Sequence, residues 1–469
     1  MTSREELKKT NSPLDSWLNR RLDVIAVPGQ LALGALIVQF GRFSNERTAM
    51  KLRIRLSKFS PLILVLLLFS QVGAQHPKRD KVARNPPPRL PKIHFISGNN
   101  AAKIPFELTG NLILLQARLN ESGPLWFILD TGATDTVIDS QLAKALRLKA
   151  TGRTVGTGSA GTATALIFKG TSLELPNIEA TNLTLYGLPI DFLSAPLGRR
   201  ISGVIGNDIL KQLVLEVDYA SQVVNFYEPE SYQYSGAGDI LPITMEGYPF
   251  VRARFTLAGH RVIECKFEID SGSTGGITFN TPFVDRNRLL DSVSKSNQSR
   301  LGGVGGSAVA FSGRLKSISL GSFQMENLIA RFSRARRGDD ASNKYDGLIG
   351  GDILRRFKVV FDYARRRMML EPNAQFSEPF EADMSGLDLA TEGEDFSVVV
   401  VNEVEKGSPA AEAGIQDEDI ITAIDGRPVK EFTVTEIRKM FMQDGKEYLM
   451  SLKRGQKQLQ TRLKLRRLI

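Results

Sequence analysis

The chain of 469 residues has few of the residues that support nucleophilic or metal catalysis: one cysteine and three histidines. A single cysteine, Cys265, excludes an intrachain disulfide framework. Cys265 lies in an alternating apolar run, which is typical of a packed strand residue rather than of a nucleophile. The histidines His76, His94 and His260 are scattered, and the chain has no His-Glu-x-x-His motif. Serine–histidine, cysteine–histidine and zinc-peptidase chemistry therefore lack their usual residues, and we expect neither a metal nor a cofactor.

The sequence also lacks an apolar run long enough to cross a membrane comfortably, which takes about 20 residues. The apolar stretch Phe59–Phe69 follows a basic segment and precedes the small residues Val72–Ala74, so residues 50–74 resemble a signal peptide. We expect export to the periplasm or the extracellular space, with an uncleaved membrane anchor as the alternative. Residues 1–49 are then either an over-extended gene start or a short cytoplasmic tail. The Pro-rich and basic residues 75–98 are expected to form a linker.

Acidic residues are fewer than basic ones, and the formal net charge is +10. Arginines cluster at Arg334–Arg337 and Arg365–Arg367, but neither cluster is interleaved with aromatic residues or set in a nucleic-acid motif. We therefore interpret both as solvated surface and expect no nucleic-acid partner. The length suggests about three domains.

A short pattern is written twice, in Trp126–Thr134 and again 140 residues later in Phe267–Thr274. In each copy an apolar run ends in Asp, followed by a hydroxyl residue and Gly. A buried strand is thus predicted to deliver a carboxylate into a tight turn that Gly completes. Two such turns that face each other would place Asp130 and Asp270 side by side.

The repetition extends beyond this pattern, because Gly203–Tyr219 closely matches Gly347–Tyr363. A period of this size indicates a duplicated domain rather than a solenoid, whose repeats have about 20–50 residues. Alternating strands dominate both halves, with short helices expected at 140–146 and after Gly206 and Gly350. We predict a mainly β protein with two lobes, residues 99–235 and 236–375.

These residues resemble the retropepsin and pepsin-like aspartic proteases, in which each lobe or subunit donates one Asp-Thr/Ser-Gly. The resemblance implies an acid-protease fold of two homologous β-barrel lobes in which Asp130 and Asp270 share a proton and activate one water. Carboxylates about 3 Å apart cannot both ionise, so one acts as an acid and the other as a base. The resemblance further implies that Thr131 and Ser271 bond across to the opposite lobe, and that Gly132 and Gly272 offer amides to the carboxylates. Ser273 completes the second active-site turn.

The two turns differ three residues after the Asp, where the first has Ala133 and the second Ser273. In pepsin-like lobes a hydroxyl at that position bonds its own carboxylate, and a bond to the charged form lowers the pKa. The sequence therefore predicts that Asp270 ionises first and that Asp130 carries the proton.

Two glycine-rich segments are candidates for mobile hairpins. Gly156, Gly158 and Gly161 satisfy the spacing of a dinucleotide fingerprint, but the following residues are β-branched and strand-like, whereas that fingerprint needs a helix. Gly303 and Gly305 form the equivalent segment of the second half. Both segments resemble the flap that closes over the substrate in this protease family.

Residues 380–469 resemble a small α+β PDZ domain of the kind found in bacterial proteases. Ser408–Gly414 reads as a capped helix, and Thr433 with Glu436 forms a capping box that opens a second helix. The resemblance implies that a peptide C-terminus binds the loop amides and lies as a strand beside the second helix. The loop residues are Gly386, Leu387, Asp388 and Leu389. Asp388 departs from the small residue usual at its position.

We therefore predict an aspartic endopeptidase that acts on polypeptides, with a PDZ domain that binds substrate or partner C-termini. Both Asp turns occur in one chain, so we expect the monomer to be active. Two alternatives are a catalytically inactive peptide-binding protein and a PDZ-centred scaffold whose β lobes are structural.

Overall fold

The structure is a computed structural model that describes residues 90–257 and 261–469. The predicted N-terminal extension, the signal segment and the linker as far as residue 89 lie outside the described residues. Within the part that is described, none of the helices combines the length and the hydropathy needed to cross a bilayer.

The first lobe is built on a nine-stranded sheet in which β8 pairs with both β4 and β9, so that the path β9-β6-β10-β5-β4-β8 closes into a ring. Its strands are β1 (Lys92–Phe95), β3 (Glu107–Thr109), β4 (Leu112–Leu119), β5 (Leu125–Leu129), β6 (Val137–Asp139), β7 (Gly152–Gly158), β8 (Gly161–Leu175), β9 (Ile178–Leu188) and β10 (Gly203–Ile205). Strand β1 lies within the segment predicted as linker and pairs with β9. The lobe therefore begins earlier than the Pro-rich sequence suggested.

The second lobe repeats this arrangement with eight strands, and the β15–β19 pairing closes its ring. Its strands are β14 (Thr244–Met245), β15 (Pro249–Thr256), β16 (Val262–Ile269), β17 (Ile277–Phe279), β18 (Ser296–Gly303), β19 (Gly306–Leu320), β20 (Phe323–Ser333) and β21 (Gly347–Ile349). The lobe helices are α2 (Ser140–Ala145), α3 (Ser194–Leu197), α4 (Asn207–Leu210), α5 (Thr281–Asn287) and α6 (Gly351–Leu354). The short helices expected at 140–146 and after Gly206 and Gly350 are therefore present.

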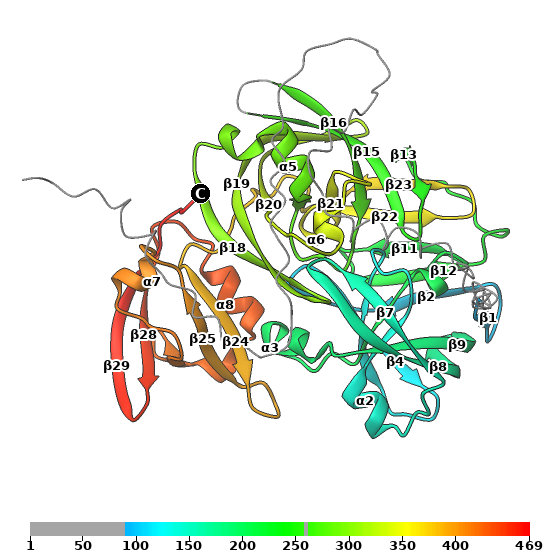
Figure 1. Cartoon of the computed structure of the whole chain (residues 1–469), viewed down its shortest axis with the longest axis horizontal. Coiled ribbons are helices and arrows are strands. Elements are labelled where there is room, and N and C mark those ends of the chain that lie inside the picture. Colours follow the sequence, from blue (N-terminus) through cyan, green and yellow to red (C-terminus); the bar gives the residue numbers. More distant parts are fainter. Residues whose placement is uncertain (1–89, 258–260) are drawn as a thin grey trace, which may run out of the picture. The chain divides into compact units, whose positions relative to one another are not determined.

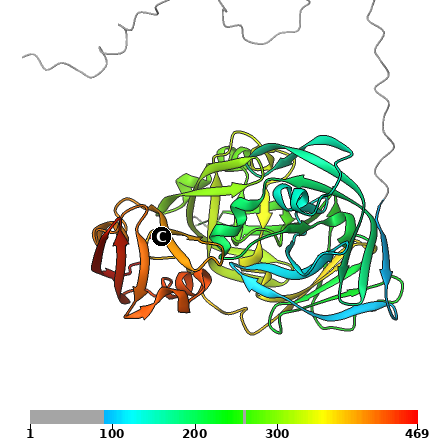
Figure 2. The same ribbon diagram turned by 90° about the horizontal axis from the view of Figure 1, so that it is seen from below.

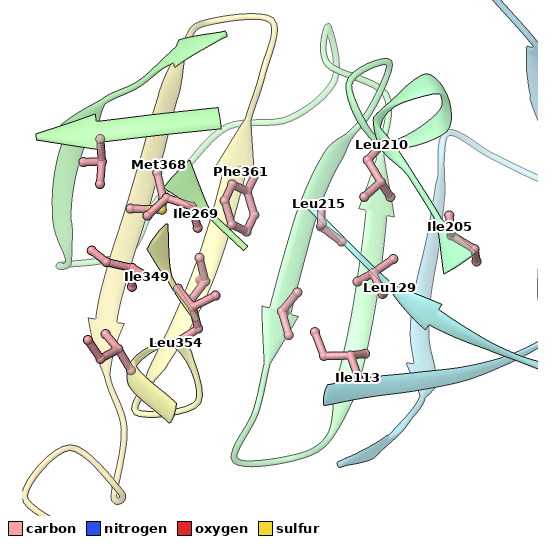
Figure 3. Close-up of a cluster of buried hydrophobic side chains, with 14 of the residues drawn as sticks. Ile113, Leu129, Ile205, Leu210, Leu215, Ile269, Ile349, Leu354, Phe361 and Met368 are labelled. Carbon is pink, nitrogen blue, oxygen red and sulfur yellow. The ribbon is translucent and has the colours of Figure 1, made fainter. Parts of the chain in front are cut away.

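A six-stranded sheet joins the lobes, with β11 of the first lobe antiparallel to β22 of the second. Each lobe contributes three strands: β2 (Asn100–Pro105), β11 (Val214–Asp218) and β12 (Val223–Tyr227) from the first, β13 (Asp239–Pro242), β22 (Phe357–Asp362) and β23 (Arg367–Pro372) from the second. Figure 3 shows equivalent side chains of the two repeats, among them Leu129 and Ile269, packed in one core around these strands. Because the core is continuous between the repeats, the two strands that end in Asp130 and Asp270 are held in one rigid unit.

Residues after 380 form a separate five-stranded path, β24-β25-β26-β28-β29, and β27 pairs with β26. The elements are β24 (Leu387–Glu392), β25 (Val398–Val404), α7 (Pro409–Glu412), β26 (Ile420–Ile424), β27 (Arg427–Pro428), α8 (Val434–Met440), β28 (Glu447–Arg454) and β29 (Lys457–Lys464). These orange-to-red strands stay together in both views (Figures 1 and 2). Thr433 and Glu436 form the predicted capping box at α8. Among the strands of residues 90–257 and 261–469, β24 pairs with β25 alone, so its other edge makes no strand pairing there.

Candidate active site

Each catalytic-type aspartate follows a buried strand that pairs in parallel with the second repeated segment of its lobe. Strand β5 pairs with β10, and β16 pairs with β21. The register continues into the turns, because the Asp130 amide donates to the Ile205 carbonyl at 3.0 Å and the Asp270 amide donates to the Ile349 carbonyl at 2.9 Å. The second repeat thus fixes the backbone from which each carboxylate projects.

Two hydroxyl residues link the turns across the lobe boundary. Thr131 Oγ1 donates to the Ile269 carbonyl at 2.7 Å and accepts from the Ser271 amide at 3.0 Å. Ser271 Oγ donates to the Leu129 carbonyl at 2.8 Å and accepts from the Thr131 amide at 3.0 Å. Thr131 and Ser271 are both buried, so these four bonds are shielded from water and fix the separation of the turns.

The glycines allow the carboxylates to approach. A Cβ on Gly132 would lie 2.7 Å from Asp270 Oδ1, and a Cβ on Gly272 would overlap the Asp130 carboxylate. Each glycine therefore lies against the acid of the opposite lobe, where any side chain would push that acid away. The two carboxyl groups also share a hydrogen bond.

The electrostatic environments of the Asp130 and Asp270 carboxyl groups differ. Among the described residues, Asp130 Oδ1 accepts from the amides of Gly132 at 2.8 Å and Ala133 at 3.1 Å, whereas the main-chain donor to Asp270 Oδ1 is the Gly272 amide at 2.8 Å. Burial raises the pKa of Asp130, but these amide bonds oppose the rise. Burial and then the charge of Asp130 hold the pKa of Asp270 well above its usual range. The two acids titrate as a coupled pair, and the additional amide bond from Ala133 favours the charged form of Asp130.

The bond on which the predicted ionisation order depended is not made. Among the described residues, the Ser273 hydroxyl makes no hydrogen bond to Asp270; its amide instead donates to the Asp270 main-chain carbonyl at 3.3 Å. The main-chain amide of Ala133, which the prediction did not count, bonds the other carboxylate, so the ionisation order itself stays a prediction.

Glu268 is a third acid at the site, and it was not among the site residues predicted from the sequence. It is 6% exposed, and its Oε1 lies 2.8 Å from the point that a Gly132 Cβ would occupy, beside Asp270 Oδ1. Burial, followed by the charges of Asp270 and Asp130, holds the pKa of Glu268 well above its usual range. The period of two along a strand could have revealed this residue, because positions 268 and 270 face the same side.

The two glycine-rich segments are hairpin tips that meet each other. A Cβ on Gly158 would lie 2.6 Å from the Val304 Cβ, and a Cβ on Gly161 would lie 2.8 Å from the Gly305 carbonyl oxygen. Gly303 is similarly close to the Ser159 side chain, whereas Gly156 has only ordinary contacts. Strand β8, not a helix, follows Gly161, so the dinucleotide geometry is absent there.

The loop before β24 differs from the expected carboxylate-binding arrangement. The Leu387 amide donates to Ser385 Oγ at 3.0 Å, and the Gly386 amide bonds Asp383. Asp388 accepts from Asn402 at 2.7 Å, and the Leu389 carbonyl accepts from Arg438. Two of the predicted carboxylate-binding amides are therefore occupied within the loop, beside an acidic side chain that would repel a C-terminus.

Comparison with known protein families matches residues 115–209 to an aspartyl protease family and residues 400–467 to a PDZ domain family. The chain contains an aspartyl protease domain and a C-terminal PDZ domain. The matched protease segment includes Asp130 and ends before Asp270, so the second lobe of the protease domain is recognised from the internal repeat and the fold.

Among curated proteins, the chain is 27% identical over 152 residues to the carboxy-terminal processing protease CtpA of Bacillus subtilis (strain 168). The aligned stretch covers 32% of this chain and 30% of that protein. The similarity is therefore confined to about a third of each sequence.

Proposed function

We propose that the protein is an aspartic endopeptidase. The observation that carries this proposal is the pair of half-buried carboxyl groups, one from each lobe, which share a hydrogen bond and whose turns are fixed by the four bonds of Thr131 and Ser271. An anionic and a protonated carboxyl side by side can act on one water and one peptide carbonyl at once.

In this reaction the Asp130 carboxylate takes a proton from the water while the water oxygen attacks the carbonyl carbon. Asp270 gives its proton to the carbonyl oxygen, which forms a neutral tetrahedral diol. The proton then held by Asp130 passes to the leaving nitrogen as the C–N bond breaks, and Asp270 recovers its proton from the diol. The two turn amides that bond Asp130, against one that bonds Asp270, favour this assignment.

The test is hydrolysis of a denatured protein mixture by Asp130→Asn and Asp270→Asn variants. Both variants are expected to lose activity by several orders of magnitude. Asp285→Asn is a matched control, because Asp285 is an exposed partner of Arg334 away from the dyad. Activity that persists in both dyad variants would favour the inactive peptide-binding protein or the PDZ scaffold.

We further propose that the PDZ domain binds extended polypeptide segments along the free edge of β24 and adds affinity rather than chemistry. Because the amides of Gly386 and Leu387 are occupied, internal segments should bind about as well as free C-termini. Dissociation constants for matched peptides with free and amidated C-termini test this point. A large loss on amidation would restore the original prediction of C-terminal recognition.

We also propose that residues 50–74 direct export, as their basic, apolar and small-residue segments suggest. N-terminal sequencing of the protein recovered from the periplasm or medium is expected to begin near residue 75. Recovery of the intact N-terminus in the membrane fraction would favour the anchor.

A further inference from the structure

The groove in which a PDZ domain holds its peptide is covered here by a segment of the first protease lobe. Such a groove lies between the free edge of β24 and helix α8. Helix α3, with the residues that follow it, packs against both β24 and α8 (Figure 1). Helix α3 therefore blocks the position that a peptide paired with β24 would occupy.

Specific bonds hold α3 in this place. Thr391 Oγ1 on β24 donates to the Ala195 carbonyl at 2.8 Å. On α8, Arg438 donates to the Pro196 carbonyl at 2.6 Å and, with its other terminal nitrogen, to the Leu389 carbonyl of β24 at 2.7 Å. Thr391 is buried beneath the contact. These bonds end on the carbonyls of Ala195 and Pro196 in the single turn of α3, whose C-terminal carbonyls point out of the helix.

Helix α3 also packs in the apolar cluster that includes the turn of Asp130. Leu197 belongs to the same apolar cluster as Ala133, in the first catalytic turn, and Val304, at the tip of the second-lobe hairpin. The PDZ domain contacts the base of that hairpin as well, because Arg300 pairs with Glu403 at 3.4 Å and Asn297 donates to Glu405 at 3.2 Å. The domain thus contacts one hairpin directly and the catalytic turn through α3.

We propose that α3 occupies the PDZ groove as an internal competitor, and that a polypeptide bound along β24 displaces it and thereby activates the protease. Displacement removes the bonds of Ala195 and Pro196 and loosens the apolar cluster that joins Leu197 to Val304 at the hairpin tip. The touching tips at Gly158 and Val304 can then separate more readily to admit substrate. This inference rests on the proposed peptide-binding and protease functions.

A reversible cross-link tests the competition in the full chain. The Cβ built on Gly198 lies 3.9 Å from the Val434 Cβ on α8, inside the range of about 3.5–4.5 Å that disulfides use. The native Cys265 is buried, so Gly198→Cys combined with Val434→Cys introduces the reactive pair. The oxidised form is expected to lose binding to synthetic peptides that the reduced form selects from a random-sequence library. The two single-cysteine variants control for the substitutions themselves.

The opposite perturbation is Gly198→Asn. Gly198 has φ +65°, a conformation that Asn tolerates, and a Cβ added there would lie 3.2 Å from Val434 Cγ1, so the larger Asn side chain would push α3 out of the groove. Gly170→Asn is the matched control, because Gly170 has φ +72° and open space around it. Relative to that control, Gly198→Asn is expected to bind the selected peptides about tenfold more tightly, because a smaller fraction of the molecules has α3 in the groove. It is also expected to raise kcat/KM for a short fluorogenic peptide.

The outcomes separate the inference from the functions on which it depends. Equal peptide binding by the oxidised and reduced forms, or lower kcat/KM in Gly198→Asn than in Gly170→Asn, would overturn the internal competition alone. Binding in no variant would overturn PDZ peptide recognition and the inference with it. If no variant hydrolyses the peptide, the protease function is refuted. The binding measurements would then still test whether α3 competes with the peptide.

Discussion

Replacing Glu268 with Gln removes one ionisable group from the three carboxyl groups at the centre of the protease domain and nearly preserves the side-chain shape. Glu268 faces Asp270 and Asp130, and the side chain of Tyr345 hydrogen-bonds its carboxyl. The other acidic or titratable groups near it are Asp339 and Tyr248. None of these neighbours is cationic, so a charge on either Glu268 or Asp270 opposes ionisation of the other without compensation nearby.

The size of the effect follows from the geometry. Glu268 Oε1 and Asp270 Oδ1 lie 2.8 and 2.7 Å from the same point beside Gly132, so their separation cannot exceed the sum of these distances. Two unit charges roughly 5 Å apart repel by about 3 kcal/mol at an effective dielectric constant of about 20, which corresponds to about 2 pKa units. Glu268 and Asp270 titrate as a coupled pair, so only about half of this shift is expected in the loss of the Asp270 proton.

The assay is the pH dependence of kcat/KM for a short peptide. In Glu268→Gln the basic limb, which reports loss of the dyad proton in the free enzyme, should move about 1 unit toward acid. Glu264→Gln is the matched control on the same strand, because Glu264 is exposed and pairs with Arg252. A basic limb that stays in place in a folded Glu268→Gln variant would refute the coupling between Glu268 and Asp270.

Three further predictions concern the dyad, the first lobe and assembly. Ser273→Ala should leave both limbs of the pH profile unchanged, because the hydroxyl makes no described bond to Asp270; an acidic limb that rises would restore the sequence-based assignment. Burial raises the pKa of Asp208 to about 6 from 3.8. The folded protein therefore keeps its full stability with respect to this group below about pH 4, and its free energy of unfolding falls as the pH rises through about 6. Asp208→Asn keeps an oxygen to accept from Thr136 Oγ1, and urea unfolding should show it more stable than the parent by up to about 3 kcal/mol at pH 7.5, with little gain at pH 4; an equal gain at both pH values would exclude the ionisation as the cause. Because the dyad forms within one chain, specific activity should not change on dilution to a demonstrably monomeric state, and a concentration-dependent loss at constant stability would contradict this.

The sequence by itself determined the features that depend on local pattern. An apolar run that ends in Asp-x-Gly specifies a strand and a tight turn, and its recurrence 140 residues later specified two lobes. The capping residues at Ser408 and Thr433 act within one helical turn, so the starts of α7 and α8 were visible in the sequence.

Only the tertiary structure decided the features that depend on groups distant along the chain. Glu268 lies beside Gly132 because the two lobes meet there, and the main-chain amide of Ala133, not the Ser273 hydroxyl, supplies the additional bond to a carboxylate of the pair. The PDZ groove is covered by α3, about two hundred residues earlier in the chain, and the bonds involved end on main-chain carbonyls. Every residue carries such a carbonyl, so no pattern of side chains marks those that accept a bond from a distant strand or helix.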